Sequence, residues 1–382
     1  MQGLSIAISS GSTNRGDEAI VMAMIAELHR RGHRVRVVFS RNPSRTERRL
    51  GVAGAPIVPT TAHGSRVLDR IDLLLWGGGG LIHDHSSALY FPYFSLRAMQ
   101  ALRRRTPVAL FAVGAGSIRR QSTKMLARYL VTRCHLRTVR DEGALEALRG
   151  CGIESEVLVT ADPAFLLSAS GSPNPLPRRG VIFAVRDWFI HDHRLVPRSV
   201  LMRCGLRGSS PQSKALIAMY AEAADRVAEM GLDVSFVAMS PEFGSDDLMT
   251  SRQIVARMHH PADVIEDDLT VPELIQTFAQ AKVVVAMRMH ATILTLVAGS
   301  RVVMIPYSAK GTVLASRMGL QDWSLGVGSC TADLLVQKVR GALAAGDGFD
   351  RRLQAARDRM RLEALRSFDL VDDLAARLVG RR

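Results

Sequence analysis

Short, fully apolar runs alternate with amphipathic stretches along most of the chain. In the first half, apolar runs predict buried strands at residues 4–12 and 35–40, and two further buried strands, in DLLLWGGGGLI and PVALFAVGAG, are predicted to stop at their glycines. Helical spacing of apolar positions predicts a helix over residues 17–33, and residues 136–153 read as a strand followed by a helix. Buried strands that alternate with helices are typical of a parallel sheet covered on both faces.

Residues 168–180 interrupt this alternation. The sequence SASGSPNPLPRRG contains three prolines and several small residues, so it continues neither a helix nor a strand and we interpret it as a linker. The alternation then restarts, with strands predicted at residues 181–188, 233–240, 282–287 and 301–307 and helices at 213–231, 270–281 and 290–300. A long, Arg-rich amphipathic helix is predicted from about Asp350.

These elements predict an α/β fold with two doubly wound, Rossmann-like domains and a cleft between them. We assign residues 1–170 to the first domain, 178–345 to the second and 346–382 to a C-terminal helical segment. Ligands of doubly wound sheets bind beyond the carboxyl ends of the strands. The loops at those ends are therefore the candidate sites.

Two such loops lie in the first domain. In SSGSTNRGDEA, the start of a helix presents free N–H groups to an anion or a sugar hydroxyl, although plain N-capping by Asp17 is the alternative. In WGGGGLIHDHSS, four glycines allow close approach by a ligand, with a flexible turn as the alternative, and Asp84 can accept a proton from a hydroxyl. His83 and His85 raise the question of a metal. The HDH motif recurs at residues 191–193, but neither copy has an evident third ligand, so we predict no metal site.

The second domain places cations at three strand ends. Arg186 ends the first strand, Arg288 and His290 follow the strand at 282–287, and Lys310 follows the next strand. An extended backbone would aim Arg288 and His290 at one ligand, because they are two residues apart. The alternatives are a salt bridge for Arg186 and a rim pair bonded to carbonyl groups for the other two. Guanidinium groups suit carboxylate and phosphate oxygens, and histidine transfers protons near neutral pH. We predict a site for a small, multiply anionic substrate that must be protonated.

The amino-acid composition limits the kinds of molecule that this protein is expected to bind. The net charge of +14 favours an anionic substrate, a nucleic acid or an anionic membrane surface. Aromatic residues make up only 5%, which gives no platform for stacking bases, so we predict no nucleic-acid partner. The four cysteines lack metal or disulfide spacing and fit a reducing cytoplasm. The pattern predicts neither a signal peptide nor a membrane span, and peripheral membrane contact stays open.

Several of these motifs together resemble a known family. The landmarks of the polysaccharide pyruvyl transferase family resemble, in order, GSTNRGDEAI, WGGGGLIHDHSS, VRDEGALEALRGCGI, VTADPAFLL, AVRDW and AMRMHATILTLVAGSRVVMIPYSAKG, from about residue 5 to about residue 320. The resemblance implies a GT-B-like fold and transfer of the enolpyruvyl carbons of phosphoenolpyruvate to a sugar, which forms a cyclic pyruvate ketal. It implies phosphoenolpyruvate as co-substrate and no other cofactor.

The resemblance also assigns residues. Arg186, Arg288 and His290 would hold the phosphate and carboxylate of phosphoenolpyruvate, with Lys310 beside them, and His290 would be the acid. The acceptor side would comprise Asn14, Asp17, Gly78, Gly79, Asp84 and His85. Our hypothesis makes Asp84 the base for the sugar hydroxyls. The chain departs from the family at Ser308 and Ala309, where an acidic residue is common, so the acceptor stays undefined.

Two other functions remain open. A GT-B glycosyltransferase would bind a nucleotide sugar in the same cleft, with residues 242–247 as a candidate for the ribose. A non-catalytic protein that binds a polyanion or an anionic membrane would use the net charge and the basic C-terminal helix. For the transferase we expect a cytoplasmic enzyme whose acceptor can be lipid-linked, at the inner face of the membrane. The sequence does not define the oligomeric state.

Overall fold

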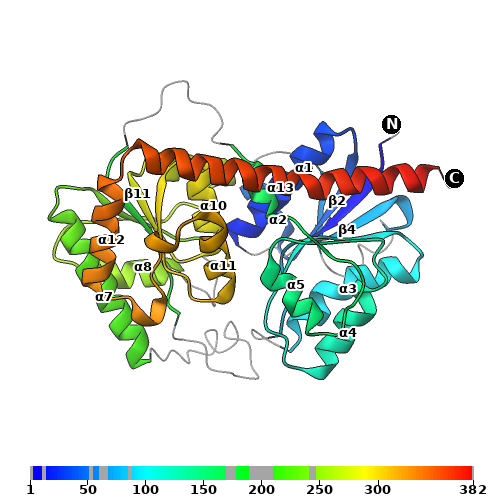
Figure 1. Cartoon of the computed structure of the whole chain (residues 1–382), viewed down its shortest axis with the longest axis horizontal. Helices are drawn as coiled ribbons and strands as arrows, with labels where there is room; N and C mark the ends of the chain where they lie inside the picture. Colours follow the sequence, from blue (N-terminus) through cyan, green and yellow to red (C-terminus); the bar gives the residue numbers. More distant parts are fainter. Residues whose placement is uncertain are drawn as a thin grey trace. The chain divides into compact units, whose positions relative to one another are not determined.

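The computed structural model describes residues 3–10, 14–50, 55–59, 68–84, 88–168, 178–188, 210–240 and 247–380. The chain divides into two compact units (Figure 1). The first unit consists of residues 1–13, 17–167 and 359–382, and the second of residues 14–16 and 168–358. Most of the predicted linker lies outside the described residues.

The first unit is built on a parallel sheet of seven strands in the order β3-β2-β1-β4-β5-β6-β7. The strands are β1 (Ser5–Ser9), β2 (Arg34–Ser40), β3 (Ile57–Pro59), β4 (Leu73–Ile82), β5 (Val108–Ala115), β6 (Leu136–Val139) and β7 (Leu158–Val159). The helices are α1 (Arg15–Arg30), α2 (Pro43–Leu50), α3 (Tyr90–Arg103), α4 (Gln121–Val131) and α5 (Glu142–Arg149). The predicted strands are confirmed, because their apolar side chains form the buried core of this unit.

The second unit is built on a parallel sheet of five strands in the order β10-β9-β8-β11-β12. The strands are β8 (Val181–Ala184), β9 (Val234–Val237), β10 (Asp263–Ile265), β11 (Val283–Ala286) and β12 (Arg301–Met304). The helices are α7 (Pro211–Ala228), α8 (Asp247–Val255), α9 (Val271–Ala279), α10 (Met289–Val297), α11 (Ala309–Met318) and α12 (Ala332–Ala344). Helix α7 packs against α12, and α9 packs against α10.

Each sheet has one point where the order of the strands reverses. In the first unit the chain leaves β1 toward β2 and β3 and returns to pair β4 on the other side of β1. In the second unit the same reversal separates β8 from β11. The loops after these four strands leave in opposite directions and open a crevice for a ligand. The prediction of two doubly wound sheets is therefore confirmed, and these two reversals locate the candidate sites.

The four glycines at residues 77–80 lie inside β4, so the predicted loop at this position is wrong. Gly78 has a φ of +76°, and a Cβ there would lie 2.5 Å from Ile20 Cγ2 and 2.8 Å from Met24 Sδ of α1. A Cβ on Gly77 would lie 2.1 Å from the carbonyl oxygen of Phe111. The strand therefore needs glycine at both positions so that α1 and β5 can pack closely against it.

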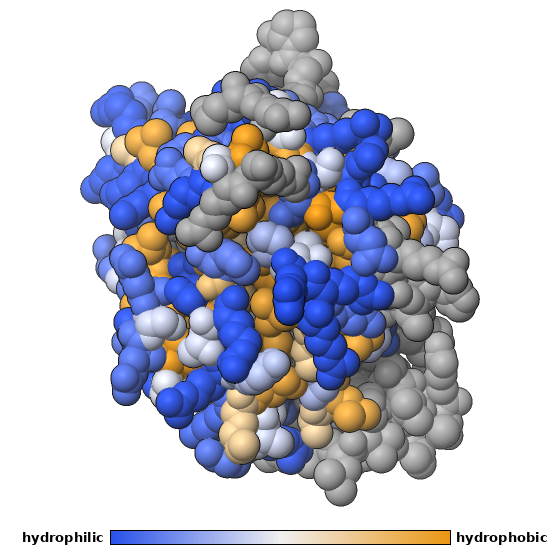
Figure 2. All heavy atoms as spheres, turned by 90° about the vertical axis from the view of Figure 1, so that its right-hand side faces the viewer, coloured by the Kyte–Doolittle hydropathy of each residue, from blue (hydrophilic) through white to orange (hydrophobic). Residues whose placement is uncertain are grey.

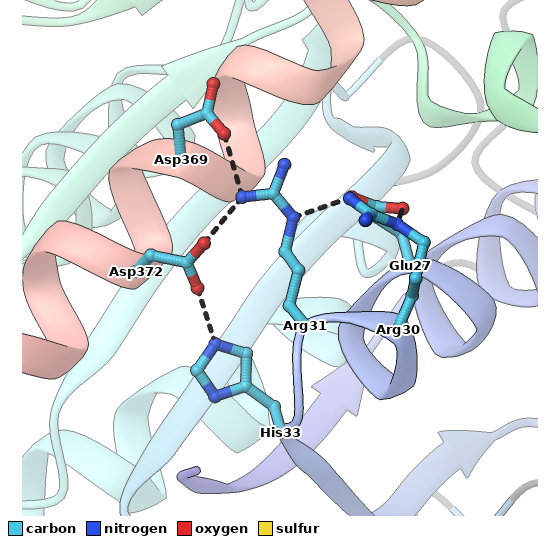
Figure 3. A network of polar contacts seen from close by, with 6 residues as sticks. All are labelled: Glu27, Arg30, Arg31, His33, Asp369 and Asp372. Carbon is cyan, nitrogen blue, oxygen red and sulfur yellow. Dashed lines mark hydrogen bonds and ion pairs between the residues drawn. The ribbon is translucent and has the colours of Figure 1, made fainter. Parts of the chain in front are cut away.

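The C-terminal helix α13 (Asp347–Val379) does not form the separate segment that the sequence predicted. Its residues up to Asp358 group with the second unit, where Arg301 holds Asp350 through Nε at 2.8 Å and Nη2 at 2.7 Å. From Arg359 onward the helix groups with the first unit. There the Arg31 guanidinium contacts Asp369 and Asp372, and His33 bonds Asp372 (Figure 3).

Candidate active site

Arg186 and Arg288 lie at the reversal point of the second sheet. The register pairs Ala184, the last residue of β8, with Ala286, the last residue of β11, and each arginine lies two residues beyond the end of its strand. Arg186 is buried, and its burial lowers the pKa of its guanidinium, as does the nearby positive charge of Arg288. Two cations held this close in a protein interior need an anion beside them.

Asp247 supplies one such anion. Its carboxylate accepts hydrogen bonds from Arg288 Nε at 2.6 Å and Nη2 at 2.7 Å. The Asp247 side chain is only 1% exposed, at the first residue of α8, and it also accepts the Ser240 N–H at 3.0 Å. These hydrogen bonds of Arg288 thus go to a carboxylate, whereas the alternative interpretation of the sequence had given it carbonyl partners. Asp247, which the glycosyltransferase alternative placed near a ribose, forms an ion pair with Arg288. The other residues of that candidate, 242–246, lie outside the described residues.

Arg288 has an extended backbone, but a helix begins at the next residue, so the extended stretch that was predicted to aim Arg288 and His290 at one ligand does not reach His290. Helix α10 begins at Met289, which makes Arg288 its N-cap and His290 its second residue. Within the described residues, no side chain caps α10 or α11. The first N–H groups of both helices, at the positive end of each helix dipole, favour an anion at this edge of the sheet.

An aromatic pair lies beside Arg186, and the sequence analysis did not identify it. The Arg186 guanidinium lies 5.3 Å from the centroid of the Tyr307 ring, and its Nη1 lies 3.4 Å from the tyrosine hydroxyl. Trp188 packs against Tyr307, and the centroids of their two rings lie 4.4 Å apart. Lys310 follows as the second residue of α11 and is half-buried. Trp188 and Tyr307 lie within the motifs AVRDW and PYSAK, so the sequence contained a signal that could have identified them.

His290 is held by the segment of residues 14–16, which groups with the second unit. A Cβ on Gly16 would lie 2.2 Å from Nδ1 of His290, so the imidazole lies directly against the glycine. Arg15 fixes the segment, because its buried guanidinium donates to the carbonyl oxygens of Ala238 at 2.5 Å and Asp267 at 2.7 Å. The predicted acceptor residue Asn14 belongs to the same segment. Arg15 could not be predicted from the sequence, because its partners lie more than 200 residues away.

Asp84 follows β4 at the reversal point of the first sheet. Its buried carboxylate accepts the backbone N–H groups of Arg119 at 3.0 Å and of Arg120 at 2.7 Å. These amides precede α4, so Asp84 holds the start of this helix. The role of Asp84 as base stays a prediction, with this structural role beside it.

Asp17 lies in the first turn of α1, two residues after the helix begins, so the alternative of N-capping by Asp17 is wrong. Burial raises the pKa of Tyr90, and the charge of Asp17 raises it further, which indicates that the two side chains are close. Tyr90 also stacks on His83, with ring centroids 4.1 Å apart. The sequence analysis did not identify Tyr90 as part of this edge.

Some predicted residues cannot be placed. His85 and the second HDH motif lie outside the described residues. Among the residues that the structure describes, no cluster of three His, Cys, Asp or Glu side chains is suited to a metal ion. Gly79, like Gly78, is buried inside β4, where it pairs with Val113.

Comparisons with known proteins agree with this architecture. A family model described as polysaccharide pyruvyl transferase matches residues 14–309. The amylovoran biosynthesis protein AmsJ of Erwinia amylovora is 23% identical over 291 residues, which cover 72% of this chain and 66% of AmsJ. This chain thus spans slightly less than two thirds of that relative.

Solved structures resemble the chain in fold. A glycosyltransferase from Rickettsia africae has a TM-score of 0.62 at 9% identity, with 100% of both chains covered. UDP-GlcNAc 2-epimerase from Neisseria meningitidis, bound to UDP-GlcNAc, has a TM-score of 0.57 at 12% identity, with 98% of this chain and 100% of the epimerase covered. The predicted GT-B-like α/β fold is therefore confirmed.

Proposed function

Because this chain belongs to the polysaccharide pyruvyl transferase family, we propose that it moves the pyruvyl group of phosphoenolpyruvate onto a sugar of a cell-surface polysaccharide or glycolipid precursor. The observation that carries the proposal is the pair of adjacent guanidinium groups at the reversal point of the second sheet. Together with Lys310 and the starts of α10 and α11, these two cations favour a small, multiply charged anion.

The chemistry needs an acid, two nucleophilic hydroxyls and a stabilised leaving group. His290 would donate a proton to C3 of phosphoenolpyruvate, which leaves cationic character at C2. One sugar hydroxyl would add to C2 and lose its proton, with Asp84 as the predicted base. A second hydroxyl would then replace the phosphate at C2 and pass its proton to the departing group, which closes the ketal and releases inorganic phosphate. The arginines would stabilise the departing phosphate, and the reaction needs no cofactor beyond phosphoenolpyruvate.

Millimolar phosphoenolpyruvate should raise the melting temperature of the wild type. A ligand at 100 times its Kd stabilises a folded protein by about 2.7 kcal/mol, which corresponds to a shift of several degrees. Lys310→Ala should reduce the shift, because it removes a cation at the carboxyl edge of the sheet. Lys282→Ala is the matched control, because Lys282 is exposed and lies at the start of β11, at the opposite edge.

The same measurement separates the proposal from its main rival, a glycosyltransferase that uses a nucleotide sugar. Under the proposal, UDP at equal concentration shifts the melting temperature much less than phosphoenolpyruvate does. A shift with UDP and none with phosphoenolpyruvate would replace the proposal with the rival. Arg288→Lys tests the contact itself, since lysine can still pair with Asp247 but lacks the planar fork that binds a carboxylate or phosphate. Its shift should be smaller than that of the wild type.

Gly16→Ala should lower kcat by about 10- to 100-fold, because the new methyl group would push the His290 imidazole away from its position. The measurement is steady-state turnover together with thermal unfolding of the same sample. Gly346→Ala is the control, since nothing lies within 4 Å of a Cβ at that position. Wild-type kcat in Gly16→Ala would mean that the exact place of the imidazole does not matter.

A further inference from the structure

Exposed apolar side chains gather on two neighbouring helices of the first unit. Of the large hydrophobic residues that are exposed in the described part of the chain, most lie on or beside α3 and α4: Leu89 (74%), Tyr93 (37%), Met125 (65%) and Tyr129 (49%). Helices α3 and α4 pack against each other. We call the surface formed by these four side chains the α3–α4 face.

The spacing of these residues makes each pair a row along its helix. Leu89 directly precedes α3 and Tyr93 lies one turn later, and Met125 and Tyr129 are one turn apart on α4. Helix α4 also buries an opposite side, through Thr123, Ala127, Leu130 and Val131, against the core. The exposed row is therefore not needed to attach the helix to its own unit.

The sequence segment that carries these rows is strongly basic, although one of its arginines, Arg104, pairs with Asp69 from outside the segment at 2.9 Å. Residues 85–140 contain eleven Lys and Arg residues and no Asp or Glu, which is most of the net charge of +14. The exposed ones are Arg103, Arg104, Arg105, Arg119, Arg120, Arg128 and Arg133. Arg133 lies over the Tyr129 ring, with its guanidinium carbon 4.0 Å from the centroid. Figure 2 shows the side of the molecule that lies at the right of Figure 1, where hydrophobic residues lie among hydrophilic ones on the surface.

We infer that the α3–α4 face binds the surface of an anionic phospholipid membrane. Phosphate groups of the lipids would pair with the arginines, and the methionine, leucine and tyrosine side chains would enter the boundary between headgroups and acyl chains. A free polyanion would use the charges but would leave the apolar rows in water. A second copy of the same face would bring two basic surfaces together without an acidic partner. An anionic bilayer provides partners both for the basic side chains and for the apolar rows.

The face adjoins the residue predicted to serve the acceptor. The backbone amides of Arg119 and Arg120 hold Asp84, and the side chains of the same two arginines are exposed. Membrane binding would thus bring the sugar of a lipid-linked acceptor toward this edge of the first sheet. The delivery of a lipid-linked acceptor rests on the proposed function, whereas the binding of the α3–α4 face to lipid does not.

The test is cosedimentation of the full chain with vesicles of phosphatidylcholine alone or with one third phosphatidylglycerol, at low and at high salt. Wild type should bind the anionic vesicles at least tenfold more tightly than the neutral ones, and salt should weaken the binding. The double variant Met125→Ser/Tyr129→Ser should lose at least tenfold in affinity. The control Leu334→Ser/Leu362→Ser removes exposed apolar side chains of α12 and α13 and should bind as the wild type does.

A second pair of variants tests the charges. Arg119→Gln/Arg128→Gln should weaken binding to anionic vesicles by about tenfold or more, at roughly 1 kcal/mol for each charge near the surface. Arg351→Gln/Arg361→Gln, on exposed positions of α13, is the matched control. Equal binding to both kinds of vesicle, or equal losses in variants and controls, would overturn the inference.

The shift in melting temperature with phosphoenolpyruvate separates this inference from the proposed function. Loss of vesicle binding in Met125→Ser/Tyr129→Ser with an unchanged shift would support the membrane face and leave the donor site intact. Vesicle binding by a wild type that shows no shift with phosphoenolpyruvate would support the face and remove the proposed function.

Discussion

Replacing His290 with alanine should lower kcat for pyruvyl transfer by about 10²- to 10⁴-fold, the usual contribution of a positioned acid. The imidazole is half-buried at the second position of α10, so its removal leaves the helix intact. Turnover of phosphoenolpyruvate with a sugar acceptor measures the effect, and thermal unfolding checks the fold.

The control for this experiment is His29→Ala, because His29 is exposed in the last turn of α1. It should keep wild-type turnover. If His290→Ala itself keeps near-wild-type turnover, another group supplies the proton and the assignment of the acid is wrong. A loss of binding without a loss of kcat would instead limit His290 to holding the phosphate or carboxylate.

Replacing Asp247 with alanine should lower the free energy of unfolding by about 3–5 kcal/mol, the usual cost when one partner of a buried ion pair is removed. The variant leaves the Arg288 guanidinium, 15% exposed, beside the second cation at Arg186 without its carboxylate. Chemical denaturation measures the loss. Inorganic phosphate should then stabilise the variant more than it stabilises the wild type, because the anion replaces the missing carboxylate.

Asp350→Ala is the matched control. Asp350 accepts two hydrogen bonds from Arg301, at 2.8 and 2.7 Å, in the same forked geometry, but its side chain is 44% exposed. Solvent screens such a pair, so its removal should cost no more than about 1 kcal/mol. Equal losses in the two variants would show that burial does not set the strength of the Asp247 pair, and would contradict its role as the buried anion that holds Arg288.

The buried strands were readable from the sequence, because a parallel sheet covered on both faces requires nearly continuous apolar runs. The same reasoning placed Arg186 and Arg288 correctly at the carboxyl ends of their strands. Strand β3 and helix α2 are among the elements that were missed, since a strand of three residues is too short to show alternation and the segment PSRTERRL contains only one apolar residue, Leu50. The glycines of β4 were read as a loop, because sequence alone does not show that a helix and a neighbouring strand need the space.

The sequence by itself therefore determined the fold class, the positions of the strand ends and the concentration of positive charge over residues 85–140. Only the tertiary structure decided that Asp247 pairs with Arg288, that Gly16 lies against His290, and that Met125 and Tyr129 stay exposed. The physical reason is the range of the interactions. Strands and charge density follow from neighbouring residues, whereas ion pairs, close contacts and exposure depend on segments that meet only after the chain has folded.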